Sequence, residues 1–359
     1  MIPPLPPRAD WSNKLLAWFA RQRRPMPWRD DPSPYKVWIS EIMLQQTQVA
    51  TVIPYFNRFI ARCPDVQALA KAPLETTLKL WEGLGYYSRA RHLHRAATLI
   101  VETRDGKFPT RYSEWLTLPG VGFYTAAAIA SIANGEAVPA VDGNVLRVFA
   151  RCLGFRDNIA APAVRRQLFD RLQDRLVQDG LTAGDFNQAV MELGALVCRP
   201  RSPACAECPL ASVCVAHRDN CTRELPVRTR PRSGPRYQVA AVRLKADNCY
   251  LLVKRPTDGL LGGLWELPNA RRKGREPLIE TAARAIEHIL GTPAPCAAPL
   301  IKCGRFTHTF SHFSETVHVF SAQQTVLTKP LDPTTADWVA PAKREMRPLT
   351  TAARKALAL

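Results

Sequence analysis

The feature that most constrains the fold of this 359-residue chain is a change of residue pattern near residue 223. Between residues 8 and 215, apolar residues recur at three- and four-residue spacing and sustained alternation is absent, which is typical of packed helices. Residues 223–236 then read RELPVRTRPRSGPR, with five Arg, three Pro and no apolar repeat, as in a linker. A helical domain that ends at this segment is therefore expected.

The pattern beyond the linker indicates a second domain of a different class. Residues 237–244, 250–253 and 317–320 are predicted strands, and residues 280–290 are a predicted helix closed by Gly291. We therefore expect an all-α domain, a linker and an α+β domain, with bounds 1–222, 223–236 and 237–359.

The charge of the chain restricts its partners. It carries 49 Lys and Arg against 31 Asp and Glu, a net charge of +18, and its 46% hydrophobic residues are enough to build a core. Nucleic acid is the first candidate partner and an anionic membrane the second. No apolar run reaches the roughly 18 residues of a spanning helix, and the N-terminus does not have the pattern of a signal peptide. We expect a soluble cytoplasmic protein.

Five of the ten cysteines lie within residues 198–221, and the other five are scattered (Cys63, Cys152, Cys249, Cys296, Cys303). Clustering in a long chain favours metal or iron–sulfur ligation in a reducing compartment over a disulfide scaffold. The clustered residues have the spacing Cys198-x6-Cys205-x2-Cys208-x5-Cys214, with Cys221 outside it. Zinc is the structural competitor, although zinc sites usually have two close pairs and this segment has one.

A glycine-rich turn lies between two helical patterns, Tyr112–Thr117 and Phe123–Ala133. Its residues are Leu118-Pro119-Gly120-Val121-Gly122. A Gly-x-Gly sequence alone is most often an ordinary turn. The absence of side chains beside a helix N-terminus also allows backbone N–H groups to bind a phosphate.

Two carboxylates stand in unusual surroundings. Glu41 lies among apolar residues and is followed by the uncharged polar run Gln45, Gln46, Thr47 and Gln48, which suits hydrogen bonding to base edges. A helical Glu on the solvent face is the ordinary alternative. Asp142 precedes Gly143 after an apolar stretch, where a helix cap is the ordinary alternative.

Together, the hairpin Pro119-Gly120-Val121-Gly122, the segment Val141-Asp142-Gly143-Asn144 and the cysteine spacing resemble the helix-hairpin-helix DNA glycosylase superfamily. The cysteines resemble its iron–sulfur branch, which includes endonuclease III and MutY-type adenine glycosylases. The resemblance covers residues 10–220 and implies an all-α glycosylase domain. It also implies a 4Fe–4S cluster held by Cys198, Cys205, Cys208 and Cys214.

Position 124 distinguishes endonuclease III-like from MutY-type enzymes. Endonuclease III-like enzymes have a nucleophilic Lys there, and this chain has Tyr124. The stretch from Val37 to Val49 resembles the catalytic motif of MutY-type enzymes instead. By resemblance, Glu41 protonates N7 of adenine and Asp142 stabilises the sugar cation, the division of roles known from glycoside hydrolysis. Tyr124 and Asn144 are implied to orient the site.

The resemblance also implies residues that contact DNA. Gln46 and Tyr86 match the wedge positions that fill the gap left by a flipped base. Arg89 begins a basic face with Arg91 and Arg95, which either contacts phosphates or is simply solvated. The complete set of expected DNA-binding residues is Gln45, Gln46, Thr47, Tyr86, Arg89, Gly120, Val121 and Gly122.

The C-terminal domain resembles a Nudix domain without its metal-binding glutamates. Ala285, His288 and Ile289 stand where Glu residues would hold Mg²⁺, so nucleotide hydrolysis is not expected. The loop Phe310-Ser311-His312 matches the part of the family that recognises 8-oxoguanine. Core packing for Phe310 and a surface position for His312 are the ordinary alternatives.

The combined prediction is a monomeric, monofunctional adenine glycosylase of base excision repair, acting on duplex DNA with 8-oxoguanine:A or G:A mispairs. In a bacterium it would associate with the nucleoid. Three alternatives compete with it: an endonuclease III-like enzyme for oxidised pyrimidines, a DNA-binding protein with a structural metal, and a Nudix hydrolase. Tyr124 argues against the first alternative, the Gln-rich motif against the second and the missing glutamates against the third.

Overall fold

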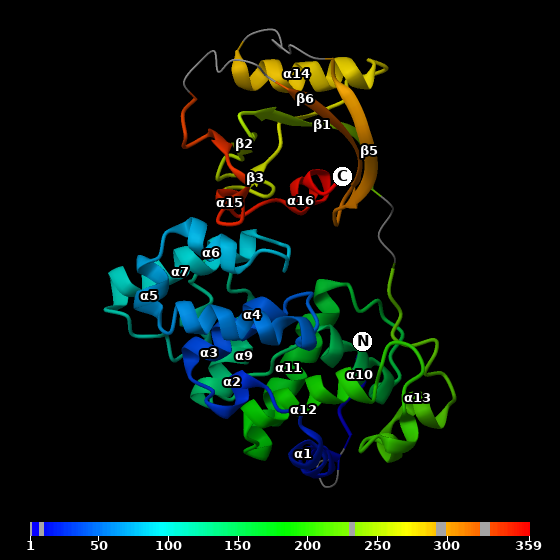
Figure 1. The fold of residues 1–359 in the computed structure, drawn as a ribbon. Helices are drawn as coiled ribbons and strands as arrows, with labels where there is room; N and C mark the ends of the chain where they lie inside the picture. Colours follow the sequence, from blue (N-terminus) through cyan, green and yellow to red (C-terminus); the bar gives the residue numbers. More distant parts are fainter. Residues whose placement is uncertain (1, 7–10, 230–233, 292–298, 324–330) are drawn as a thin grey trace. The chain divides into compact units, whose positions relative to one another are not determined.

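The computed structural model describes residues 2–6, 11–229, 234–291, 299–323 and 331–359 (Figure 1). Part of the expected linker and Cys296 lie outside these ranges. By contacts, the chain forms two compact units: residues 1–71 with 92–230, and residues 72–91 with 231–359. Among the described residues, no helix is long and apolar enough to cross a membrane.

The first unit is helical, as the periodicity predicts. Its helices are α1 (Trp11–Gln22), α2 (Pro27–Asp30), α3 (Pro34–Leu44), α4 (Val49–Arg62), α5 (Val66–Lys71), α8 (Tyr112–Trp115), α9 (Phe123–Asn134), α10 (Gly143–Leu153), α11 (Pro162–Asp179), α12 (Ala183–Leu196) and α13 (Val215–Arg218). Helix α7 (Ser88–Arg104) has its first turn in the second unit. Two 3₁₀ turns, η1 (Cys205–Glu207) and η2 (Ala211–Val213), form the cysteine-rich segment.

Helices α1, α10, α11 and α12 build the main core of this unit through residues such as Leu15, Phe149 and Leu193. Helix α3 is buried over almost its whole length, from Tyr35 to Met43. It begins with Ser33, whose hydroxyl accepts a hydrogen bond from the Lys36 N–H, and with Pro34 in the first turn, both of which favour helix initiation. Glu41, in the middle of this helix, is therefore buried.

The second unit contains a seven-stranded sheet. Its strands are β1 (Arg236–Ala246), β2 (Cys249–Lys254), β3 (Trp265–Glu266), β4 (Asn269–Arg271), β5 (Ile301–Thr309), β6 (Ser314–Gln323) and β7 (Ala336–Val339). The main order is β3-β2-β1-β6-β5, with β4 also pairing with β1 and β7 with β2. The β1–β6 pair is parallel and the other pairs are antiparallel. The expected fold class is confirmed.

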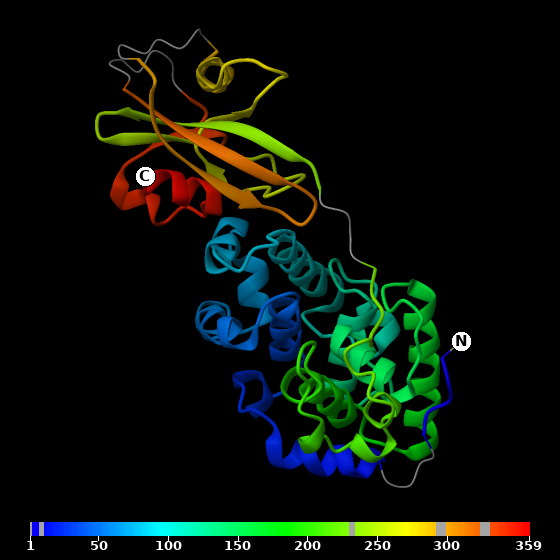
Figure 2. The same cartoon turned by 90° about the vertical axis from the view of Figure 1, so that its right-hand side faces the viewer.

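The two faces of the sheet pack against different helices (Figure 2). Side chains alternate along β1, so Val239 and Ala241 face α16 (Thr351–Leu357), whereas Ala240 and Val242 face α14 (Leu278–Leu290). Helix α14 ends at Gly291 with φ 69°, the left-handed cap that the sequence predicts. A short helix, α15 (Pro341–Arg344), precedes α16.

Residues 72–91, which include α6 (Leu74–Leu80), group with the second unit by contacts. The Glu75 carboxylate accepts a hydrogen bond from Trp265 Nε1 at 2.8 Å. The Glu82 carboxylate accepts one from the Leu349 backbone N–H at 3.0 Å. The contact-based boundary thus differs from the one expected at residue 223, because long-range side-chain bonds of this kind have no signature in a sequence pattern.

Candidate active site

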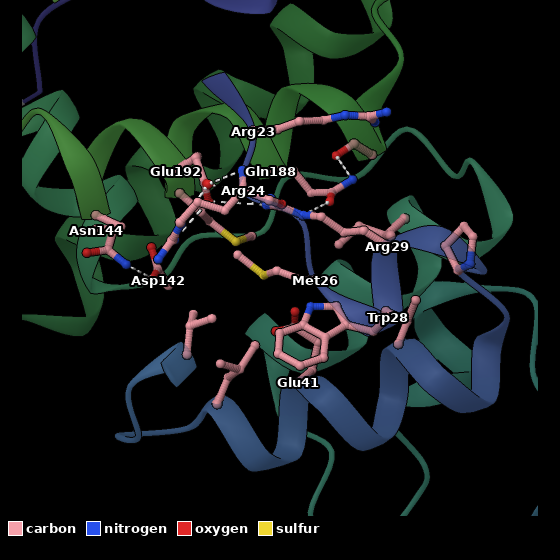
Figure 3. A pocket seen from close by; sticks show the side chains of 18 of the residues that line it. Arg23, Arg24, Met26, Trp28, Arg29, Glu41, Asp142, Asn144, Gln188 and Glu192 are labelled. Carbon is pink, nitrogen blue, oxygen red and sulfur yellow. Dashed lines mark hydrogen bonds and ion pairs between the residues drawn. The ribbon is translucent and has the colours of Figure 1, made fainter. Parts of the chain in front are cut away.

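A cavity of about 740 Å³ lies in the first unit, lined by residues from α2, α3, α9, α10 and α12 (Figure 3). Glu41, Tyr124, Asp142 and Asn144 all line it. The fold therefore brings together the four residues that the sequence predicts to be catalytic, although they come from three different helices and a helix cap.

Glu41 is only 6% exposed because it lies on the buried helix α3. Burial raises the pKa of Glu41 to about 7, and the nearby Asp142 carboxylate adds to this effect. A hydrogen bond from Tyr124 and the charge of Arg29 oppose the rise. A carboxyl group with a pKa near 7 can both donate and accept a proton at neutral pH, as general acid–base catalysis requires.

Asp142 is both a helix cap and a cavity residue. Its Oδ1 accepts a hydrogen bond from the Val145 N–H at 2.7 Å, which caps α10. Its Oδ2 accepts one from Asn144 Nδ2 at 2.8 Å. Burial raises the pKa of Asp142, while these hydrogen bonds and Arg147 favour the carboxylate. The ordinary and the functional interpretations of Asp142 are therefore compatible.

Tyr124 connects α9 to Glu41. Its hydroxyl donates to Glu41 Oε2 at 2.7 Å and lies 3.5 Å from Met191 Sδ. Burial, together with the Glu41 and Asp142 charges, raises the pKa of Tyr124 well above 10. The phenol keeps its proton and remains a hydrogen-bond donor.

An ion-paired cluster on the cavity wall was missed by the sequence analysis. Glu192, 2% exposed on α12, binds Arg24 Nε at 2.8 Å and Arg29 Nη2 at 3.2 Å. Arg29 Nε also donates to Gln188 Oε1 at 3.0 Å. Although burial alone would raise it, the pKa of Glu192 is lowered by these two guanidinium groups. The missed signal was a Glu within an apolar helix, the same signal that marked Glu41.

The polar run after α3 divides between two environments. Thr47 and Gln48 line the cavity, and Gln45 donates from Nε2 to Thr125 Oγ1 at 3.1 Å. Gln46 is exposed and has φ 59°, a left-handed conformation that non-glycine residues rarely adopt. Strained, exposed residues of this kind are concentrated at functional sites.

Tyr86, the other expected wedge, belongs to the second unit and shares these properties. It is 46% exposed with φ 48°, and its hydroxyl lies 3.2 Å from Ser311 Oγ. Arg89 is only 8% exposed; it donates to the carbonyls of Leu84 and Gly85. Arg89 therefore supports the turn that presents Tyr86, and its contact with phosphate stays a prediction.

The two glycines of the hairpin differ in whether the fold requires a glycine at their position. Gly120 has φ 76°, and a Cβ atom there would lie 2.5 Å from His92 Cβ, so only glycine fits. Gly122 caps α9, and a Cβ there would meet open space. Val121 is buried. The fold thus requires glycine at position 120, whereas it does not require glycine at position 122.

The four cysteines of the predicted cluster site are of intermediate exposure, and two of them, Cys198 and Cys208, pack against the main core of the first unit. Burial raises the pKa of Cys208 to about 12, and the charges of the neighbouring cysteines add to this effect. Among the described residues, no three His, Cys, Asp or Glu side chains converge as a site for one metal ion.

Arginines connect the cysteine segment to the active site. Arg147 donates to Asn144 Oδ1, to the Gly194 carbonyl and to the Cys198 carbonyl, each at 2.8 Å. Buried Arg151 lies 3.4 Å from Cys198 Sγ through Nη1, where it can stabilise a thiolate. A continuous chain of hydrogen bonds therefore runs from Asp142 to the first cluster ligand.

The Phe310-Ser311-His312 loop joins β5 to β6 in the second unit. Ser311 and His312 are exposed, and the Phe310 ring stacks on Phe313 with centroids 4.4 Å apart. The Phe310 N–H donates to the Phe313 carbonyl at 2.8 Å, which closes a tight turn. The two polar residues of this loop are accessible to a ligand.

Three family models match separate segments. Residues 39–173 match the HhH-GPD superfamily base excision DNA repair protein, residues 198–214 the iron-sulfur binding domain of endonuclease III, and residues 239–359 the NUDIX domain. Residues 198–214, which contain the four cysteines, are thus an iron–sulfur binding domain.

Curated relatives match most of the chain. Adenine DNA glycosylase of Rattus norvegicus is 39% identical over 365 residues, covering 86% of this chain and 69% of the relative. That of Buchnera aphidicola subsp. Schizaphis graminum is 34% identical, covering 86% of both. A thermostable thymine-DNA glycosylase structure superposes with a TM-score of 0.51 and 26% identity over 58% of this chain and 95% of its own. The chain belongs to the adenine DNA glycosylase family and is a hydrolase of N-glycosyl bonds.

Proposed function

We propose that this enzyme is a monofunctional glycosylase that removes adenine mispaired with 8-oxoguanine, or with guanine, from duplex DNA. Tyr124 carries the proposal of monofunctional chemistry. A phenol whose pKa is raised well above 10 has no amine to form an imine with the sugar, and its O–H is already donated to Glu41.

In the first step, protonated Glu41 gives its proton to N7 of the flipped adenine. The C1′–N9 bond then breaks, its electron pair passes to the base, and neutral adenine leaves. A cation with oxocarbenium character remains on the sugar, and the Asp142 carboxylate stabilises it. Asn144 and the Val145 N–H hold that carboxylate in place.

In the second step, water attacks C1′ and ionised Glu41 accepts its proton, which restores the acid form. Arg24, Arg29 and Glu192 form a polar wall for the excised base in the same cavity. These steps require no electron transfer. Cys198, Cys205, Cys208 and Cys214 would hold the iron–sulfur cluster, and the Cys198 carbonyl accepts the hydrogen bond from Arg147, which in turn donates to Asn144. When bound, the cluster supplies a structural and redox-capable centre.

Recognition of the opposite base is assigned to the C-terminal loop. Exposed Ser311 and His312 supply hydrogen-bonding groups. We propose that the exposed side chains of Tyr86 and Gln46 fill the gap left by the flipped adenine. We propose that the enzyme acts as a monomer in the cytoplasm, at the nucleoid in a bacterium.

The decisive experiment uses one duplex with a single 8-oxoguanine:A pair. We expect an alkali-labile site on the adenine strand, little cleavage before alkali, and no covalent adduct after borohydride reduction. Glu41→Gln should bind this duplex and leave the adenine in place, whereas Glu102→Gln, an exposed control on α7, should excise normally. An adduct trapped by borohydride would contradict the monofunctional mechanism.

The choice of opposite base has its own test. The double variant Ser311→Ala, His312→Ala should lose most of the preference for 8-oxoguanine:A over G:A in single-turnover excision. Thr307→Ala, an exposed control on β5, should retain it. An unchanged preference in the double variant would remove this loop from the proposal.

A further inference from the structure

The first unit contains a second cavity, of about 530 Å³, which is lined by residues of α8, α9 and α11 and is called here the α9–α11 cavity. Its volume is within the range of small-ligand sites. Tyr124 lines both this cavity and the catalytic cavity. Val141 lines the α9–α11 cavity, and the next residue, Asp142, lines the catalytic one. The two cavities therefore adjoin each other.

The walls of the α9–α11 cavity are largely aromatic. Tyr112 and Phe169 both line it, with ring centroids 6.1 Å apart and an interplanar angle of 31°. Phe123, the first residue of α9, also lines it and is 68% exposed. An exposed Phe side chain adds little to the core, but its face is free to stack on a planar ring. The walls thus favour a ligand with a planar aromatic group.

The α11 side of the cavity is basic. Arg165 and Arg166 line it, and both are exposed near the start of α11. Asp170 also lines it, so two guanidinium groups stand against one carboxylate. Guanidinium groups bind phosphate and also stack on planar rings. Aromatic side chains beside basic ones are the combination with which proteins bind single-stranded nucleic acid.

The position of the cavity identifies the source of such a ligand. The target adenine is flipped into the catalytic cavity, so its strand passes close to Tyr124 and to the hairpin that precedes α9. A neighbouring base that is paired is held in the stack and cannot reach the aromatic walls. We propose that the α9–α11 cavity binds an unpaired nucleotide of a DNA strand. Its base stacks on Phe123 and Phe169, and its phosphate meets Arg165 and Arg166.

This site goes beyond the proposed function, because excision of adenine from a fully paired duplex does not use it. The test uses the full chain and a short oligothymidylate that contains one 2-aminopurine, whose fluorescence reports stacking. We expect the emission to change on binding. We also expect an oligonucleotide with an abasic residue at that place to bind at least about fivefold more weakly. Equal affinity for the two oligonucleotides would mean that only the phosphates are bound, and would overturn the proposal.

Variants of the cavity locate the binding. Phe123→Ala removes the exposed ring and should lose the emission change and at least about fivefold in affinity. Val177→Ala, at an exposed apolar residue farther along α11, is its matched control. Thermal melts establish that each variant is folded. An unchanged emission response in folded Phe123→Ala would place the base elsewhere and would sink the proposal.

The basic side is tested separately, so that the proposal stays falsifiable if Phe123→Ala folds poorly. The double variant Arg165→Gln, Arg166→Gln should weaken binding of the oligonucleotide and reduce its dependence on salt. Arg62→Gln, at an exposed residue of α4, should change both much less. If the double variant and Arg62→Gln behave alike, the phosphate does not bind in this cavity.

A competition experiment distinguishes a DNA strand from a free nucleotide. Deoxyadenosine monophosphate should displace the oligonucleotide at least about tenfold less effectively than unlabelled oligothymidylate does, because it lacks the neighbouring phosphates. Equal competition would assign the cavity to free nucleotides and overturn the assignment to a strand. None of these measurements involves excision, so their failure would leave the proposed glycosylase function untouched.

Discussion

Glu41 shows how two local effects set the proton affinity of one residue. Burial on α3 favours the neutral acid, and the hydrogen bond from Tyr124 favours the carboxylate. Burial is the larger effect, which leaves the pKa at about 7. The same helix without Tyr124 would hold Glu41 as an acid to higher pH.

This balance predicts the pH dependence of adenine excision. The single-turnover rate should fall as pH rises above about 7, because the protonated form of Glu41 is lost. It should also fall at acid pH as Asp142 becomes protonated. Tyr124→Phe removes the donor that favours the Glu41 carboxylate. In this variant the alkaline limb of the pH–rate profile, where the excision rate falls, should therefore move to higher pH. A limb that stays in place, or moves to lower pH, would contradict the assigned roles.

At the scale of elements, Asp142 both caps α10 and places a carboxylate in the active site, and substitutions can separate these two roles. Asp142→Asn keeps a side-chain oxygen for the Val145 N–H, so we expect near-normal thermal stability with loss of excision. Asp142→Ala should lose excision and about 0.5–2 kcal/mol of stability as well. Thermal unfolding and single-turnover kinetics of the two variants measure this. Retained excision in Asp142→Asn would show that the charge is dispensable.

The hairpin offers a second matched pair. Gly120→Ala forces φ 76° on alanine and places its Cβ against His92, so the folded state should lose about 1–3 kcal/mol. Gly122→Ala meets no neighbour and should fold normally. Its Cβ would stand beside the N–H groups at the start of α9 and should weaken duplex binding. Fluorescence anisotropy at fixed salt and thermal melts separate the two effects; full affinity in Gly122→Ala would refute the phosphate role.

At the scale of the whole molecule, the cluster segment and the active site form one hydrogen-bonded system through Arg147. Cys208→Ser should lose iron and the visible absorbance of the cluster, with reduced stability of the first unit. Cys221→Ser, at a buried cysteine outside the four-residue spacing, should retain both. Iron analysis and absorption spectra provide the measurement. A full iron content in Cys208→Ser would exclude Cys208 as a ligand.

The sequence by itself determined the features that depend on neighbouring residues. The change of periodicity predicted the helical and α+β parts, and Gly291 predicted the end of α14. The spacing of the four cysteines marked residues 198–214, the segment that matches an iron–sulfur domain. These features are local, since periodicity, helix capping and short cysteine spacings depend on residues that lie close together in the sequence.

Only the tertiary structure decided how distant residues meet. It placed Glu41 and Asp142 in one cavity, and it showed that Arg24, Arg29 and Glu192 form part of its wall. The same packing buried Arg89 behind the turn that carries Tyr86, where the sequence indicated a basic face. The physical reason is that burial, ion pairing and shifted pKa values arise from contacts between residues far apart in the chain, and hydrophobic periodicity does not encode the partner.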